Sequence, residues 1–175
     1  MIERLQMSSY KNKLFIYLSL FAALSIDSLS FTNILHNIKP SFVLMVLVYW
    51  NMALPDKVGI TTSLFFGLLV DVFEGSLLGV HALIFVLVAY LCQRFFYQFR
   101  VAPIWQQSLA LVILSLIFRL LLAIDYFDSI PERINLSDSI YFLNSFYYAI
   151  STAVFWPVVY FSCRFYRRRF LQSKY

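Results

Sequence analysis

Five ionisable side chains lie inside or beside the apolar segments of this 175-residue chain, and they are the residues best suited to chemistry. They are Asp27, Asp71, Glu74, His81 and Arg119. A histidine beside a carboxylate can transfer protons, and two facing carboxylates can act as an acid–base pair. A charged group in an apolar medium is also costly, so it normally faces protein or trapped water. Any role for these residues therefore depends on the segments that surround them.

The sequence patterns of common catalytic sites are absent. The chain contains no GxSxG or HExxH motif and no glycine-rich phosphate loop. Its two histidines, His36 and His81, are separated by two apolar segments. Asp27 and Asp71 share no sequence context, whereas an intramembrane aspartyl protease needs two carboxylates in matched motifs. We therefore expect no enzyme activity, no metal site and no cofactor.

The composition indicates an all-α integral membrane protein. Hydrophobic residues make up 61% of the chain and charged residues only 13%, and the mean hydropathy is +0.75. A soluble domain of this size could not bury so much apolar surface. The two cysteines, Cys92 and Cys163, are too few for a disulfide framework.

Six apolar segments predict a six-transmembrane-helix bundle that forms a single domain of residues 1–175. The predicted spans are about 14–31, 41–54, 59–73, 80–96, 104–124 and 140–161. The second segment would cover only ~21 Å as a helix, against a hydrocarbon core of ~30 Å. It is therefore expected to be a short helix whose ends are completed by polar residues or by a thinner bilayer.

The distribution of Lys and Arg predicts the orientation. With both termini in the cytoplasm, the cytoplasmic set comprises three residues before the first span, Lys57, Arg94 and Arg100, and five residues after the last span. The outer loops would hold only Lys39 and Arg133. This bias follows the positive-inside rule. The basic tail is thus expected to anchor the topology and touch membrane lipid, and nucleic-acid binding is not expected.

Small residues recur every four positions in the third segment and the turn that follows. The candidate packing or partner-binding residues are Ser63, Gly67, Asp71, Gly75 and Gly79. Steps of four keep residues on one helical face. In a membrane such a stripe lets two helices approach closely.

The predicted topology places all five ionisable residues near the outer ends of their spans, within ~9 Å of the interface. This depth predicts one outer polar cluster of Asp27, Asp71, Glu74, His81 and Arg119. In that cluster Arg119 is expected to pair with Asp71 or Asp27, because buried charges usually survive in pairs. Two simpler interpretations remain open: Arg119 snorkels to the interface, and His81 caps a helix.

An ordered set of short motifs resembles the family of the rod shape-determining protein MreD, in its gammaproteobacterial form. The motifs are Tyr49-Trp50, Ala53-Leu54-Pro55, Val58-Gly59, Gly67-x-x-x-Asp71-x-x-x-Gly75, Leu78-Gly79-Val80, Ala89-Tyr90-Leu91 and Trp105-Gln106-Gln107. The resemblance implies a multi-pass protein of the bacterial inner membrane that serves lateral cell-wall elongation. It also implies an architecture similar to the membrane substrate-binding subunits of vitamin importers. The implied partners are the bitopic scaffold MreC and, indirectly, MreB, RodA and a class B penicillin-binding transpeptidase.

The sequence thus favours a non-enzymatic scaffold subunit that maintains rod cell shape by binding an MreC-type partner. The alternative is a small-molecule carrier subunit with a pocket that opens to the periplasm. A purified complex would discriminate between them, since the scaffold should retain a protein partner and the carrier a small molecule.

Overall fold

The computed structural model describes residues 2–29, 39–75, 77–95, 98, 101–128 and 137–170, and their long regular elements are all α-helices. These helices are α1 (Ile2–Ser28), α3 (Phe42–Ala53), α4 (Ile60–Glu74), α5 (Val80–Arg94), α7 (Ile104–Asp128) and α8 (Ser137–Phe170). The all-α expectation is confirmed for this part of the chain. Arg100, Arg133 and Lys174, which contribute to the charge bias, lie outside the described residues.

The first and last helices are longer than the apolar segments that predicted them. α1 begins at Ile2 rather than near residue 14, and α8 continues to Phe170 rather than to residue 161. Neither glycine nor proline occurs before Pro40, so nothing in the polar N-terminal sequence interrupts the helix. Among the described residues, two stretches are long and apolar enough to cross a membrane: Ile104–Ala123 of α7 and Phe142–Arg169 of α8.

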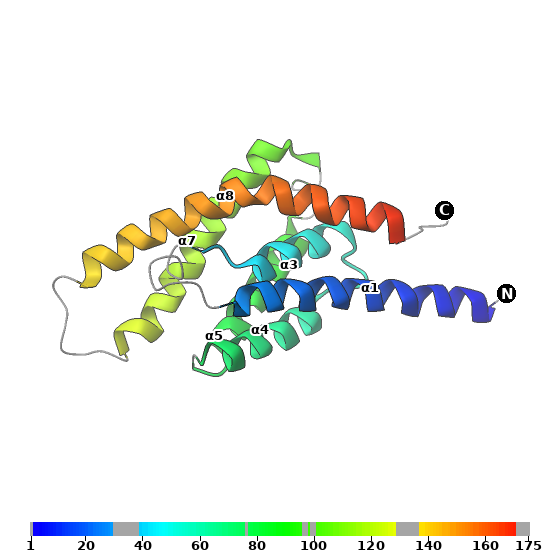
Figure 1. Cartoon of the computed structure of the whole chain (residues 1–175), viewed down its shortest axis with the longest axis horizontal. Helices are drawn as coiled ribbons and strands as arrows, with labels where there is room; N and C mark the ends of the chain where they lie inside the picture. Colours follow the sequence, from blue (N-terminus) through cyan, green and yellow to red (C-terminus); the bar gives the residue numbers. More distant parts are fainter. Residues whose placement is uncertain are drawn as a thin grey trace.

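The shortest of these six helices, α3, lies at the centre of the molecule. It is placed between α1 and α8 and also contacts α5 (Figure 1). Its ten residues from Val43 to Met52 are all buried. A helix that is apolar on every side must be surrounded by protein or lipid. The short apolar segment 41–54 is thus enclosed by other helices of the chain.

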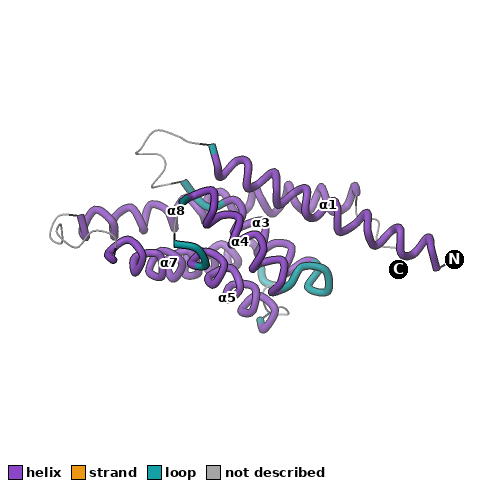
Figure 2. The backbone as a smooth tube through the Cα atoms, turned by 90° about the horizontal axis from the view of Figure 1, so that it is seen from below, coloured by secondary structure: helices purple, strands orange, loops and turns teal. Residues whose placement is uncertain are grey.

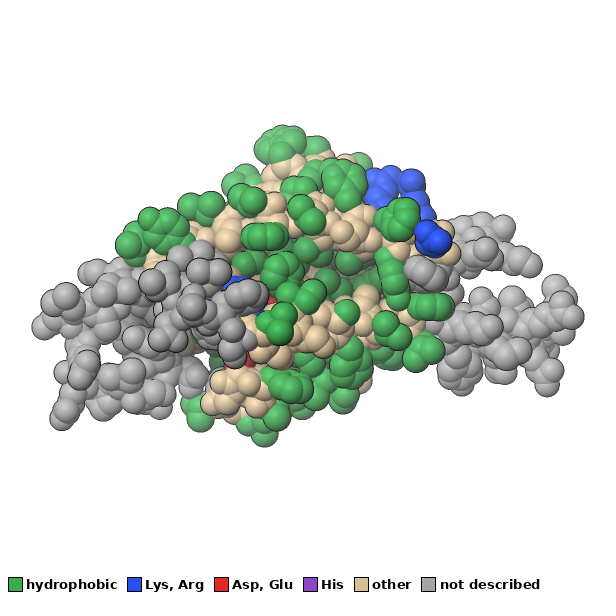
Figure 3. Space-filling model, in the orientation of Figure 1, with side chains coloured by type: hydrophobic (Ala, Val, Ile, Leu, Met, Phe, Trp, Pro, Cys, Tyr) green, Lys and Arg blue, Asp and Glu red, His purple; other side chains and the backbone are tan. Residues whose placement is uncertain are grey.

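Two helical hairpins pack around α3. α4 and α5 form one hairpin, and α7 and α8 form the other (Figure 2). The N- and C-termini lie at the same end of the molecule (Figure 1). The C-terminal end of α7 and the N-terminal end of α8 lie toward the opposite end. Hydrophobic side chains cover much of the visible surface, and blue basic side chains gather near the C-terminal end (Figure 3).

The hairpin of α4 and α5 depends on Gly67. A Cβ atom added there would lie 2.3 Å from the Ala82 Cα atom and 2.7 Å from its backbone nitrogen. Ser63 and Asp71, one turn away on either side, are also buried at this face. The small-residue stripe therefore holds two helix backbones together over these three positions.

The other two glycines of the stripe shape the turn instead. Gly75 ends α4 with a φ of 66°, and Gly79 precedes α5 with a φ of 106°. A side chain on either residue would meet no atom within 4 Å, so neither is needed for close packing within the chain. Positive φ values are strained for residues with a side chain, which explains glycine at these two positions.

Candidate functional site

The buried carboxylate of Asp71 binds the start of the next helix. Its Oδ2 atom accepts a hydrogen bond from the Gly79 backbone N–H at 2.8 Å, and its Oδ1 atom accepts one from the His81 N–H at 2.9 Å. The first N–H groups of a helix have no partner within the helix and carry partial positive charge. Asp71 therefore satisfies them from the last turn of α4, as a cap supplied by a neighbouring helix.

His81 lies between two acids. Its Nδ1 atom is 2.8 Å from Asp71 Oδ1, and its Nε2 atom is 3.3 Å from Glu74 Oε2. The imidazole side chain is 4% exposed, whereas the Glu74 side chain is 47% exposed. A doubly protonated imidazole can donate to both carboxylates at once. The three residues thus form a compact group that closes the turn between α4 and α5.

Asp27 makes a second cap of the same kind. It lies in the last turn of α1, and its two oxygens accept hydrogen bonds from the backbone N–H groups of Phe42 at 3.0 Å and Val43 at 2.8 Å. The Ser41 hydroxyl donates to the same carboxylate at 3.3 Å. Lys39 adds an ion pair at 3.9 Å and donates a hydrogen bond to the Ile26 carbonyl at 3.0 Å. The start of α3 is therefore held by α1 as the start of α5 is held by α4.

Tyr148 of α8 connects the two caps. The Ser41 N–H donates to the Tyr148 hydroxyl at 3.3 Å, beside the Asp27 cap. The Tyr148 ring is stacked on Phe118, with 6.1 Å between ring centroids, and the Phe118 ring lies 5.7 Å from the His81 ring. Sequence reasoning missed Tyr148, because nothing distinguishes it from the other 11 of the 12 tyrosines in the chain.

Arg119 borders this aromatic column from α7. Its guanidinium carbon lies 5.3 Å from the centroid of the Tyr148 ring, a cation–π geometry. The carboxylates of Asp71 and Asp27, the expected partners of Arg119, accept backbone N–H groups, and their pairing with Arg119 stays a prediction.

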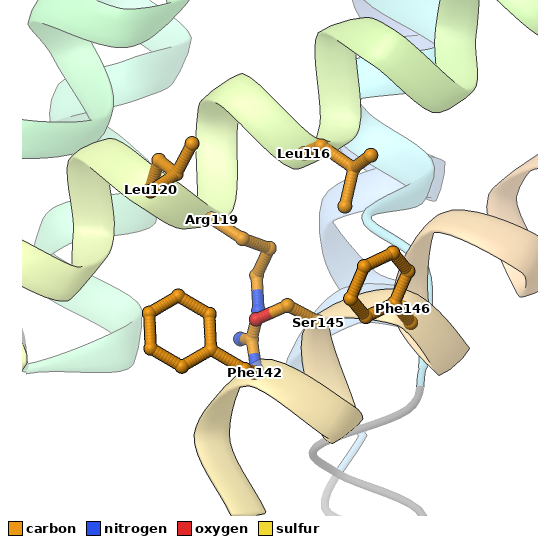
Figure 4. Close-up of a pocket in the computed structure, with 6 residues that line it drawn as sticks. All are labelled: Leu116, Arg119, Leu120, Phe142, Ser145 and Phe146. Atoms are coloured by element: carbon orange, nitrogen blue, oxygen red, sulfur yellow. The ribbon is translucent and has the colours of Figure 1, made fainter. Parts of the chain in front are cut away.

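A cleft of about 190 Å³ opens beside Arg119, between α7 and α8. Its lining residues are Leu116, Arg119, Leu120, Phe142, Ser145 and Phe146. Figure 4 shows the Arg119 side chain extending from α7 toward α8, among the two phenylalanine rings. In the part of the chain that the structure describes, no group of three or more His, Cys, Asp and Glu residues is arranged to hold a metal ion.

The predicted outer cluster is thus divided into three groups by the structure. His81 contacts both Asp71 and Glu74 directly. Asp27 forms its own cap with residues that the sequence did not single out, and Arg119 reaches the column through Tyr148. The chemistry available at both caps is the binding of backbone N–H groups, which fixes helices in place.

Comparison with known proteins identifies the family. The family model described as rod shape-determining protein MreD matches residues 8–166. The rod shape-determining protein MreD of Haemophilus influenzae is 33% identical over 132 residues, which cover 75% of this chain and 77% of that protein. No solved structure matches the chain. This match, which includes most of each of the six described helices, and this identity show that the chain belongs to the family of the rod shape-determining protein MreD.

Proposed function

We propose that this chain is a non-enzymatic inner-membrane subunit of the cell-wall elongation machinery, and that it maintains rod shape by binding a bitopic MreC-type partner. The observation that carries this proposal is the family match over residues 8–166. The geometry of the polar site supports a scaffold, because Asp27 and Asp71 bind the N-termini of α3 and α5. Such caps stabilise the arrangement of the helices, and the outer surface of the helices can then contact a partner.

The proposal includes a six-span topology with both termini in the cytoplasm. The placement of both termini at one end of the molecule supports it (Figure 1). The basic cluster Arg167, Arg168 and Arg169 lies in the last turn of α8, at that same end. Basic residues are retained on the cytoplasmic side of a membrane, so this end would face the cytoplasm. The two capped helix starts would then lie toward the periplasmic side.

The MreC-type partner would link this subunit to MreB, RodA and a class B penicillin-binding transpeptidase. An exposed apolar surface is what a partner helix within the bilayer would meet, and α4 and α5 present such a surface. Its most exposed members are Val72 and Phe73 of α4, Leu83 of α5 and Leu78 in the turn between these helices. Helix association within a membrane depends on packing and hydrogen bonds, since lipid tails are as apolar as leucine.

Co-purification tests the proposal. The full-length chain, tagged and expressed at its normal level in a rod-shaped host, is isolated in mild detergent and its bound proteins are identified. An MreC-type protein should be recovered in constant ratio with the chain, and a tagged unrelated inner-membrane protein should not recover it. Recovery of a tightly bound small molecule and no such partner would favour the carrier alternative and overturn the scaffold.

A further inference from the structure

The α4–α5 hairpin is short compared with the thickness of an ordinary bilayer. α4 and α5 have 15 residues each, and a helix of this length covers about 22 Å. The hydrocarbon core of a typical bilayer is about 30 Å thick. Tilting either helix would only reduce the thickness that it covers. The hairpin therefore falls short of a typical hydrocarbon core by about 8 Å.

The outer face of this hairpin is apolar along its whole length. Large side chains are exposed from one end to the other, namely Ile60, Phe65 and Phe73 of α4 and Leu83, Leu87 and Tyr90 of α5. The helix α3 is shorter still, but it is enclosed by other helices of the chain. With no partner bound, α4 and α5 must instead meet lipid along this face. Their length is thus a constraint on the surrounding bilayer.

The ends of the hairpin carry groups that need water. At the capped end, where Asp71 binds the start of α5, the backbone leaves the helical conformation at Gly75 and Gly79. Irregular backbone exposed to lipid is not tolerated within the hydrocarbon region. The Glu74 side chain at the same end is 47% exposed, and an exposed carboxylate also needs water. At the other end of the hairpin, Arg94 is exposed. Both boundaries of the hydrocarbon must therefore lie close to the ends of these two helices.

The other hairpin has no such deficit. The apolar stretch Ile104–Ala123 of α7 contains 20 residues, and these residues alone can cover about 30 Å. α7 and α8 form a hairpin separate from that of α4 and α5 (Figure 2). The mismatch therefore belongs to one side of the molecule.

We propose that the α4–α5 face thins the bilayer beside it, by up to about 8 Å, and that it prefers lipids with short acyl chains to lipids with long ones. A short apolar segment can be accommodated by local thinning, at a modest cost for each ångström of mismatch. Leu77 and Leu78, which are exposed in the turn between α4 and α5, would then lie at the lowered boundary. The inference rests on the proposed six-span topology and not on the MreC-type partner.

The test measures the depth of the turn with spin labels on the purified full chain. Leu78→Cys carries a label in the turn, and Leu87→Cys carries one at the middle of α5. The unsubstituted chain, whose two cysteines are buried, is the blank. Each sample is reconstituted in dimyristoleoyl- and in dioleoyl-phosphatidylcholine, and the access of a water-soluble nickel chelate and of oxygen is measured. The label at position 78 should remain accessible to the chelate in both lipids, and the label at position 87 should be accessible to oxygen alone.

Thermal unfolding of the unsubstituted chain is a second measurement that needs no substitution. The unfolding temperature should be highest in dimyristoleoyl-phosphatidylcholine, whose acyl chains are short. It should fall by several degrees in dierucoyl-phosphatidylcholine, whose chains are long, because the cost of mismatch grows with thickness. An unfolding temperature that does not depend on chain length, or that rises with it, would overturn the proposal.

The outcomes separate the failure of thinning from the failure of the topology. If the label at position 78 loses the chelate but keeps oxygen in dioleoyl-phosphatidylcholine, the turn lies within the hydrocarbon. Thinning is then overturned and the topology stands. Access of the chelate to the label at position 87 would overturn the topology itself. Loss of both reagents at position 78 would show that a second copy covers this face, and would overturn its contact with lipid.

Discussion

Replacement of Asp71 by Asn tests whether this residue acts as a cap or as a partner of a cation. The two side chains have the same shape, but a carboxamide has one acceptor oxygen where the carboxylate has two. In the structure the Gly79 N–H binds Oδ2 and the His81 N–H binds Oδ1. Whichever way an Asn side chain is turned, one of these N–H groups faces an NH₂ group. Asp71→Asn therefore loses one cap bond even though its size is unchanged.

The magnitude follows from the number of buried N–H groups left unsatisfied. Each costs ~1 to 3 kcal/mol, and the Asp71 side chain is 0% exposed, so water cannot replace it without rearrangement. Asp71→Asn should thus destabilise the chain by ~1 to 3 kcal/mol. Asp71→Ala orphans both groups and should cost ~2 to 6 kcal/mol. Glu74→Gln, at a half-exposed side chain, should cost less than about 1 kcal/mol.

The assay is equilibrium unfolding of the purified variants in mixed micelles, with membrane insertion measured first. The unsubstituted chain should be the most stable, followed by Asp71→Asn and then by Asp71→Ala. The stability of Glu74→Gln should be close to that of the unsubstituted chain. The double exchange Asp71→Arg with Arg119→Asp should recover nothing, because an arginine cannot accept the two N–H groups. Equal stability of Asp71→Asn and the unsubstituted chain, or recovery in the double exchange, would refute the capping argument.

The remaining predictions concern packing, the aromatic column, orientation and cell shape. Gly67→Ala should destabilise the α4–α5 hairpin by ~1 to 3 kcal/mol in the same unfolding assay. The additional change Ala82→Gly should not restore stability, because the added Cβ atom clashes with backbone atoms. Val72→Leu, at an exposed position of α4, is the control. Tyr148→Phe keeps the ring stack and loses one hydrogen bond, so a loss of ~1 kcal/mol is expected, and a loss as large as that of Asp71→Ala would contradict the assigned role. A periplasm-active reporter should be silent when fused at the C-terminus and active in the connection between α7 and α8; the opposite pattern would reverse the proposed orientation. Depletion of the protein should make rod-shaped cells round without stopping division, as microscopy can measure, and cells that remain rods would count against the proposed function.

The sequence alone determined the class of protein and part of its packing. Its apolar composition required helices that satisfy their own backbone groups in an apolar solvent, and the long regular elements among the described residues are indeed helices. The four-residue spacing of Ser63, Gly67 and Asp71 marked one face of α4, and that face is buried against α5. These features are local, since they follow from helical periodicity and from residue size.

The partners of the charged residues were decided by the tertiary structure. The sequence suggested Arg119 as the partner of Asp71 or Asp27. In the structure both carboxylates also bind the N-terminus of a helix, because the unsatisfied N–H groups there carry partial positive charge that the sequence does not show. Ser41 and Tyr148 meet across 107 positions of sequence, and this contact exists only because α8 packs against α3. A helical pattern shows which side of a helix is buried, but the group found opposite depends on how separate helices are placed in space.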